Sequence, residues 1–180
     1  RDMVADDPRA KQALATLARD ATKGGVTLQI TGPRADQAQA VADALFARVK
    51  LFARIDDWAR LTFRDGDSFL EVGVAANGEI VELTRKPTLE MYRWSDDFDR
   101  FYDPAAAFYW TDRPTLNDVP PANAIFFPEW QIVHARWDRD EDSRYGTPKF
   151  ASARKAYKRM TQGELDISIR RKTRSGQRFV

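Results

Sequence analysis

The sequence predicts an α+β fold: N-terminal helices, then a mostly antiparallel sheet, then one long C-terminal helix. Apolar side chains recur with helical spacing between residues 8 and 63, whereas residues 69–137 alternate in short strand-like segments. No proline interrupts residues 149–174. Helices segregated from strands in this way are typical of α+β proteins, in contrast to the regular alternation of parallel α/β folds.

The helical region begins at a capping signal. Asp7 precedes Pro8, and an N-cap side-chain acceptor followed by proline is a typical helix start. Residues 26–30 alternate and predict a short strand. Residues 35–50 and 51–63 carry apolar side chains along one helical face, so both segments are expected to be helical.

The sheet region contains a strong hairpin signal. Residues 69–74 alternate, Asn77-Gly78 follows, and residues 80–84 form the expected return strand. A type I′ turn would place both Asn77 and Gly78 at positive φ. Three prolines make residues 113–121 a loop. Further strands are expected at residues 89–94, 98–102, 107–111 and 131–137.

A corner is expected between the sheet and the last helix. Tyr145 is predicted to pack beneath it, and Gly146 to turn the chain sharply, at positive φ if the geometry requires it. Thr147 is suited to the N-cap and Pro148 to the first helical position. The resulting helix would run to about residue 173, tolerating Gly163 in its interior.

Charge is distributed unevenly along the chain. Residues 149–180 hold ten Lys and Arg against two acidic residues, a net charge of +8. Residues 1–148 hold nineteen basic and twenty-five acidic residues, a net charge of −6. An acidic body therefore carries a basic C-terminal segment, and such a segment favours a polyanion or an acidic neighbouring subunit as partner.

The basic residues crowd the end of the predicted helix. One cation there would suffice to interact with the partial negative charge of a helix C-terminus. The excess predicts contact with a polyanion such as DNA phosphate, or with acidic side chains of a neighbouring subunit or another protein partner. The residues of this basic cluster are Arg170, Arg171, Lys172, Arg174 and Arg178.

Catalytic and metal-binding signals are weak. The chain has no Cys and a single His, His134, in an apolar strand where a core role is favoured over metal binding or general-base chemistry. Nucleophile-elbow, Walker and Rossmann motifs are absent from the sequence. We therefore expect no enzymatic activity, no cofactor and no metal.

Two acidic clusters are interpreted as solvated turns. Asp138, Asp140 and Asp142 imitate the start of an EF-hand loop, but Ser143 and Lys149 occupy the positions of its glycine and its bidentate glutamate. The second cluster has no convergent partner in the sequence and comprises Asp96, Asp97 and Asp99.

An aromatic run is interpreted mainly as sheet core. Its members could alternatively stack on nucleic-acid bases, which is the less favoured reading. They are Phe101, Tyr102, Phe108, Tyr109 and Trp110.

The segments IVHARW, YG, SARKAYKRM and GELDISIRRKTRSG, together with WARLTFRDGDSFLEV nearer the N-terminus, resemble the wing and stem of tailed-phage portal proteins. Pro148 departs from that pattern. By this resemblance residues 1–146 form a wing-like domain, residues 147–174 a stem-like helix and residues 175–180 the start of a clip in an incomplete chain. The matching positions are His134, Tyr145, Gly146, Arg170 and Arg171.

The resemblance also implies partners and a location. A portal subunit assembles with itself into a ring, expected to be dodecameric, around a channel for double-stranded DNA. It docks the terminase packaging motor, head–tail connector proteins and major capsid proteins at one vertex of the virion, after assembly in the host cytoplasm. No apolar run in the sequence is long enough to span a membrane. The alternative is a small nucleic-acid-binding module that uses the basic helix.

Overall fold

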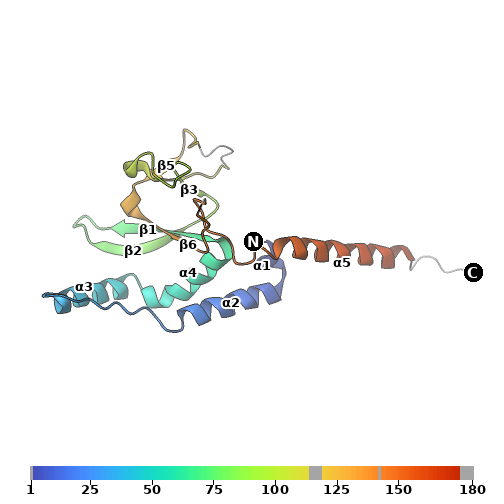
Figure 1. Cartoon of the computed structure of the whole chain (residues 1–180), viewed down its shortest axis with the longest axis horizontal. Helices are drawn as coiled ribbons and strands as arrows, with labels where there is room; N and C mark the ends of the chain where they lie inside the picture. The colour runs from blue at the N-terminus through green and yellow to red at the C-terminus, as the bar shows by residue number, and fades with distance from the viewer. Residues whose placement is uncertain (1, 114–118, 142, 175–180) are drawn as a thin grey trace, which may run out of the picture.

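The computed structural model describes residues 2–113, 119–141 and 143–174. Its helices and antiparallel strands confirm the predicted α+β class (Figure 1). The helices are α1 (Asp2–Asp6), α2 (Pro8–Thr22), α3 (Ala35–Arg48), α4 (Leu51–Asp65) and α5 (Arg154–Arg174). The strands are β1 (Asp67–Val74), β2 (Ile80–Lys86), β3 (Met91–Arg93), β4 (Phe108–Trp110), β5 (Ile125–Phe127) and β6 (Ile132–Arg136).

The body is layered. One antiparallel sheet has the order β2-β1-β6 and a smaller one the order β3-β4-β5. Figure 1 shows α2 and α4 on one side of the first sheet and the second sheet on its other side. The core between the sheets is largely aromatic and aliphatic, and buries Phe69, Met91, Ala107, Phe108, Phe127 and Ile132.

A second core joins α2 to α4. Leu14 and Ala18 of α2 are buried against Phe63 of α4, and Trp137 and Phe150 pack against this cluster. The Phe63 and Trp137 rings meet edge to face with centroids 4.5 Å apart. The chain on both sides of the corner is therefore attached to the helical layer.

The start of α2 and the break between α3 and α4 are both set by single residues. The Asp7 carboxylate accepts a hydrogen bond from the Arg9 backbone N–H at 2.8 Å, which confirms the predicted cap of α2. Lys50 adopts a left-handed φ of 54°, so α3 and α4 are separate helices.

Several strand predictions are wrong. Residues 26–30 form no strand, and Val26 remains 39% exposed, because no neighbouring strand pairs with this segment. Residues 98–102 contribute only an isolated bridge between Ser95 and Phe101. There the Asp96 side chain accepts backbone N–H bonds and closes a turn instead. The strand β5 was not predicted.

The hairpin between β1 and β2 forms with a different turn. Only Gly78 has positive φ, at 84°, and Asn77 does not. The Gly78 N–H donates to the Ala75 carbonyl, while the Asn77 side chain accepts from the Glu79 N–H. The loop thus consists of a turn followed by a left-handed glycine, so the predicted type I′ turn is wrong.

The predicted start of the last helix is also wrong. α5 begins at Arg154, and residues 149–153 form turns. The N–H groups of Ala151, Ala153 and Arg154 each donate to the carbonyl three residues earlier. The Lys149 N–H bonds to the Phe63 carbonyl at 2.9 Å, and Phe150 packs into the helical layer. These tertiary contacts hold the chain out of helical geometry, so Pro148 is not the first helical residue.

Candidate partner-binding helix

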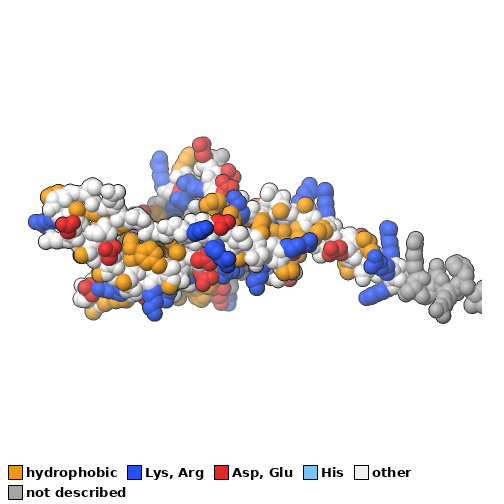
Figure 2. Space-filling view, turned by 90° about the horizontal axis from the view of Figure 1, so that it is seen from below, with side chains coloured by type: hydrophobic (Ala, Val, Ile, Leu, Met, Phe, Trp, Pro, Cys, Tyr) orange, Lys and Arg blue, Asp and Glu red, His pale blue; other side chains and the backbone are white. Residues whose placement is uncertain are grey.

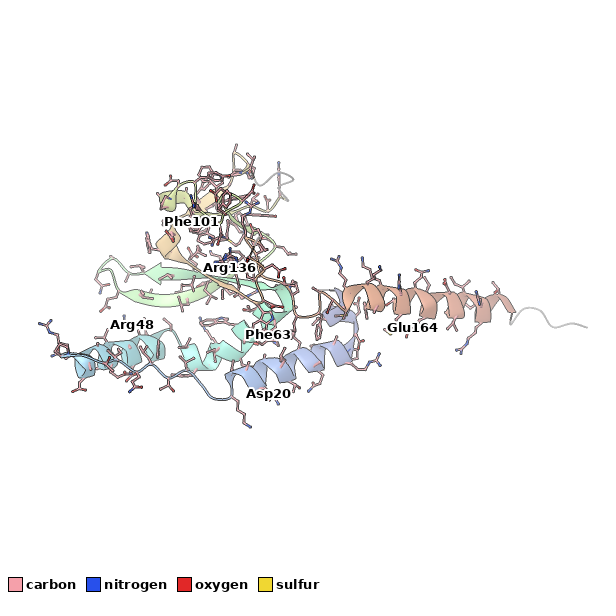
Figure 3. The ribbon with its side chains drawn as sticks, in the orientation of Figure 1. Asp20, Arg48, Phe63, Phe101, Arg136 and Glu164 are labelled. Carbon is pink, nitrogen blue, oxygen red and sulfur yellow. The ribbon has the colours of Figure 1, made fainter. Side chains whose placement is uncertain are left out.

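α5 extends from the body without a covering layer. Its 21 residues span about 31 Å at 1.5 Å per residue. Figure 1 shows it leaving the body beside α1. In Figure 3 its side chains, such as that of Glu164, are directed into open space. Among the α5 residues whose exposure is described, all but Tyr157 and Gly163 are exposed.

Exposed apolar side chains lie along α5 between basic ones (Figure 2). Helices in proteins derive most of their stability from packing an apolar face, but the large apolar side chains of this helix, apart from the half-buried Tyr157, are exposed. Its apolar surface is therefore available to a partner. The large apolar side chains and their exposed fractions are Met160 (42%), Leu165 (54%), Ile167 (53%) and Ile169 (51%).

The predicted basic cluster falls at the far end of α5. Arg170, Arg171 and Lys172 are exposed in the last turns, and Arg174 is the final helical residue. Arg178 lies outside the described residues. The structure thus brings three of the predicted side chains to one exposed helix end. Contact with DNA, a motor or a neighbouring subunit stays a prediction.

The corner that supports α5 depends on two backbones in close approach. Gly146 does not have positive φ, so the expected left-handed turn is wrong. Instead a Cβ on Gly146 would meet the Gly66 carbonyl oxygen, and would come within 2.7 Å of the Trp137 backbone nitrogen and oxygen. Glycine is required here because a side chain has no room.

Backbone hydrogen bonds lock the same corner. The Trp137 N–H donates to the Gly66 carbonyl at 2.8 Å, and the Thr147 N–H donates to the Trp137 carbonyl at 2.7 Å. Tyr145 packs against the core between the sheets, and its hydroxyl accepts the Arg93 backbone N–H at 3.0 Å. The residues that lead into α5 are therefore held by both sheets.

His134 belongs to the contacts around Tyr145 and Gly146 that hold the corner before α5; these contacts are here called the anchor of α5. Its side chain is 3% exposed and stacks on Phe69 at a centroid distance of 4.1 Å. Nε2 lies 2.8 Å from Asp67 Oδ1, which also accepts the Gly146 backbone N–H at 3.0 Å. His134 thus positions the carboxylate that holds the corner.

The hydrogen-bond partners define the protonation state of His134. Nδ1 lies 3.3 Å from Arg93 Nη1, and a guanidinium can only donate, so Nδ1 must accept. The ring is then neutral, and its Nε2–H donates to Asp67. The pKa of His134 is lowered, and burial is the largest cause. Asp67 opposes this shift, whereas the charges of Arg93 and Arg136 add to it. Both nitrogens are engaged in an enclosed site, an arrangement suited to a structural role.

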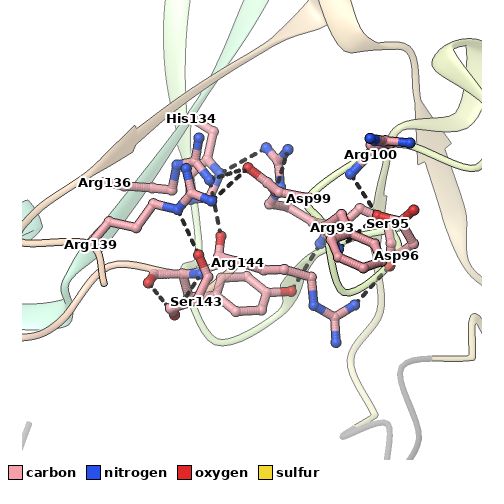
Figure 4. Close-up of polar contacts among 12 residues, drawn as sticks. Arg93, Ser95, Asp96, Asp99, Arg100, His134, Arg136, Arg139, Ser143 and Arg144 are labelled. Carbon is pink, nitrogen blue, oxygen red and sulfur yellow. Dashed lines mark hydrogen bonds and ion pairs between the residues drawn. The ribbon is translucent and has the colours of Figure 1, made fainter. Parts of the chain in front are cut away.

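Asp99 gathers three arginines, so its interpretation as a solvated turn is wrong (Figure 4). Arg93 Nη2 and Arg136 Nη1 lie 2.8 and 2.6 Å from its two carboxylate oxygens, and Arg139 Nη2 lies 3.4 Å away. Burial alone would raise the pKa of Asp99, but the bond to Arg136 and the charges of the three arginines lower it overall. The cluster joins β3, β6 and the loop that follows β6.

This ion cluster carried no sequence signal. Arg93 and Arg136 lie 43 positions apart in the sequence, and no motif relates them to Asp99. Burial lowers the pKa of Arg93, while Asp99 opposes that shift. Arg93 is nevertheless held as a cation over the Phe101 ring, 4.3 Å from its centroid. Its role is to join the two sheets beneath the corner.

The remaining predicted features lie elsewhere in the body. Phe108 and Tyr109 are buried, which confirms the sheet-core interpretation for them, whereas Tyr102 is 63% exposed. Asp138 and Asp140 lie in the loop after β6, and Asp142 is outside the described residues. No group of three or more potential metal ligands gathers among the described residues. Nor does any described helix have the length and apolar character needed to cross a membrane.

No protein-family model matches the sequence, and no curated protein shows significant similarity to it. The exposed helix and its anchor together define a body that presents a long, basic and partly apolar helix in one direction.

Proposed function

We propose that the protein is a subunit of a phage portal ring at one capsid vertex. In this role residues 1–146 form the wing-like body, and α5 contributes to the stem around a DNA channel. The ring, expected to be dodecameric, would pass double-stranded DNA during packaging and ejection. It would dock the terminase packaging motor, head–tail connector proteins and the major capsid protein in the virion.

The observation that carries the proposal is the uncovered surface of α5. A 21-residue helix whose described side chains are nearly all exposed lacks the packing that ordinarily stabilises a helix. Neighbouring copies of the same helix would supply that packing in a ring. The opposite net charges of the body and the C-terminal segment also favour association between copies.

The anchor of α5 is consistent with this role. Every subunit of a closed ring must present its contact surfaces at the same angle. The approach of Gly146 to Gly66 and the Asp67–His134 pair restrict the direction in which the chain enters α5. A freely hinged helix would not maintain one angle.

A nucleic-acid-binding module is the second candidate. Its support is the exposed Arg170 and Arg171 at the far end of α5, where phosphate could approach without obstruction. Contacts of this kind would be phosphate-directed and insensitive to sequence. A monomer that binds DNA tightly, with a steep salt dependence, is the result that favours this candidate.

The mass of the intact protein in solution tests the proposal. Light scattering and native mass spectrometry should give a large closed oligomer, and images along its axis should show a central channel. A monomer or dimer at micromolar concentration would exclude the ring. Measurements at several salt concentrations are needed because contacts between charged surfaces weaken as salt screens them.

A further inference from the structure

The long sides of α5 differ in chemistry. One side, here called the stripe side, follows steps of three and four residues and consists of Tyr157, Met160, Glu164 and Ile167. A second side, here called the basic side, follows similar steps and consists of Lys155, Arg159, Gln162, Asp166 and Arg170. All of these residues are exposed except Tyr157, which is half-buried.

Glu164 makes the stripe side selective. It lies between Met160 and Ile167 on an otherwise apolar strip, and it forms no ion pair with the residues that the structure describes. Covering the strip would remove water from this carboxylate, which is unfavourable unless the partner brings a cation. An apolar partner surface without a cation would therefore be rejected.

The basic side of a second copy meets that requirement. Arg159 precedes Glu164 by five residues, so at 3.6 residues per turn the two lie about 140° apart around the helix. One helix therefore presents the stripe side to one neighbour and the basic side to another. Two stripe sides packed in parallel register would instead place Glu164 against Glu164.

We propose that α5 binds a second copy of this chain by packing its stripe side on the basic side of the neighbour, with Glu164 paired to Lys155 or Arg159. The contact is heterologous, since different surfaces meet, and repeating it generates a ring when the rotation closes. This inference rests on the proposed ring function and specifies the surfaces and ion pair that would form it.

Charge reversal of each side tests the contact in the intact protein. Glu164→Lys alters the stripe side, and Lys155→Glu with Arg159→Glu alters the basic side. Each variant alone should self-associate about tenfold more weakly, as expected when exposed ion pairs become repulsive. An equimolar mixture should recover assembly, because alternating copies place the cation introduced on the stripe side against the carboxylates introduced on the basic side.

Lys158→Glu is the matched control. It reverses a charge next to Arg159, but the exposed Lys158 belongs to neither the stripe side nor the basic side, so assembly should persist. Circular dichroism and the melting temperature of each variant report whether the body remains folded. Sedimentation velocity of each variant and of the mixture reports assembly.

The outcomes separate this inference from the proposed function. If the wild type forms a ring and Glu164→Lys or the basic-side variant assembles equally well, this contact is wrong and the ring stands. Failure of the mixture to recover assembly while both variants remain folded also overturns the contact. A wild type that remains monomeric overturns both.

Discussion

Gly146→Ala should destabilise the body because two backbones meet at this residue. The added Cβ would meet the Gly66 carbonyl oxygen and the Trp137 backbone, and backbone atoms cannot move aside as a flexible side chain can. Overpacking of this kind costs about 1–3 kcal/mol. For a protein of this size each kcal/mol lowers the melting temperature by about 2–4 °C. Calorimetry and urea unfolding at neutral pH would measure the loss.

Gly24→Ala supplies the control for this experiment. A Cβ at Gly24 meets no atom within 4 Å, and Gly24 does not have positive φ, so its substitution should leave the melting temperature within about 1 °C of the wild type. If Gly146→Ala has the same melting temperature as Gly24→Ala and the wild type, the close approach of the backbones at Gly146 and Gly66 does not constrain the folded protein. The account of the corner would then be refuted.

Three further results are expected. The pKa of His134 is lowered in the folded protein, so the unfolded chain binds the proton more tightly. The free energy of unfolding should therefore fall as the pH drops below about 6.5. His134→Gln should flatten this pH dependence, as measured by urea unfolding. Asp99→Asn should cost roughly 3–5 kcal/mol by leaving buried Arg93 without its carboxylate, as thermal unfolding would show. Changing Arg171, Lys172 and Arg174 together to Gln should spare ring assembly but impair DNA packaging if their partner is DNA or the motor.

Each of these expectations has a contrary outcome. An unchanged pH profile in His134→Gln would show that another group governs acid sensitivity. The exposed Asp97, changed to Asn, is the control for Asp99, and equal losses in both would remove the role of the ion cluster. If the triple Gln variant fails to assemble, the basic cluster contacts a neighbouring subunit. If assembly and packaging are both normal, the cluster is only a solvated helix end.

Local signals predicted the elements whose cause is itself local. The Asp7 cap needs only the Arg9 backbone N–H two residues away, and it forms as expected. The return strand β2 follows from alternation and a nearby turn. By contrast, the alternation of residues 26–30 was misleading, because a strand also needs a neighbour and the sequence does not contain that information.

The candidate site shows the same division. The basic and apolar residues of α5 were evident from composition and spacing. The structure shows Arg170, Arg171 and Lys172 exposed at its far end, and their contact with a partner stays a prediction. The start of the helix was predicted too early, because Thr147 and Pro148 form a suitable local signal. Tertiary bonds from residues 147 and 149 to Trp137 and Phe63 override it.

The sequence by itself determined that an acidic α+β body precedes a long basic helix, because charge, helical spacing and capping are properties of neighbouring residues. Only the tertiary structure decided why Gly146 is needed and what Asp99 and His134 do. Gly66 and Gly146 lie 80 positions apart, and their contact exists only once β1 and β6 are paired. The arginines around Asp99 also come together only in the folded protein. No regular spacing in the sequence relates them to this carboxylate.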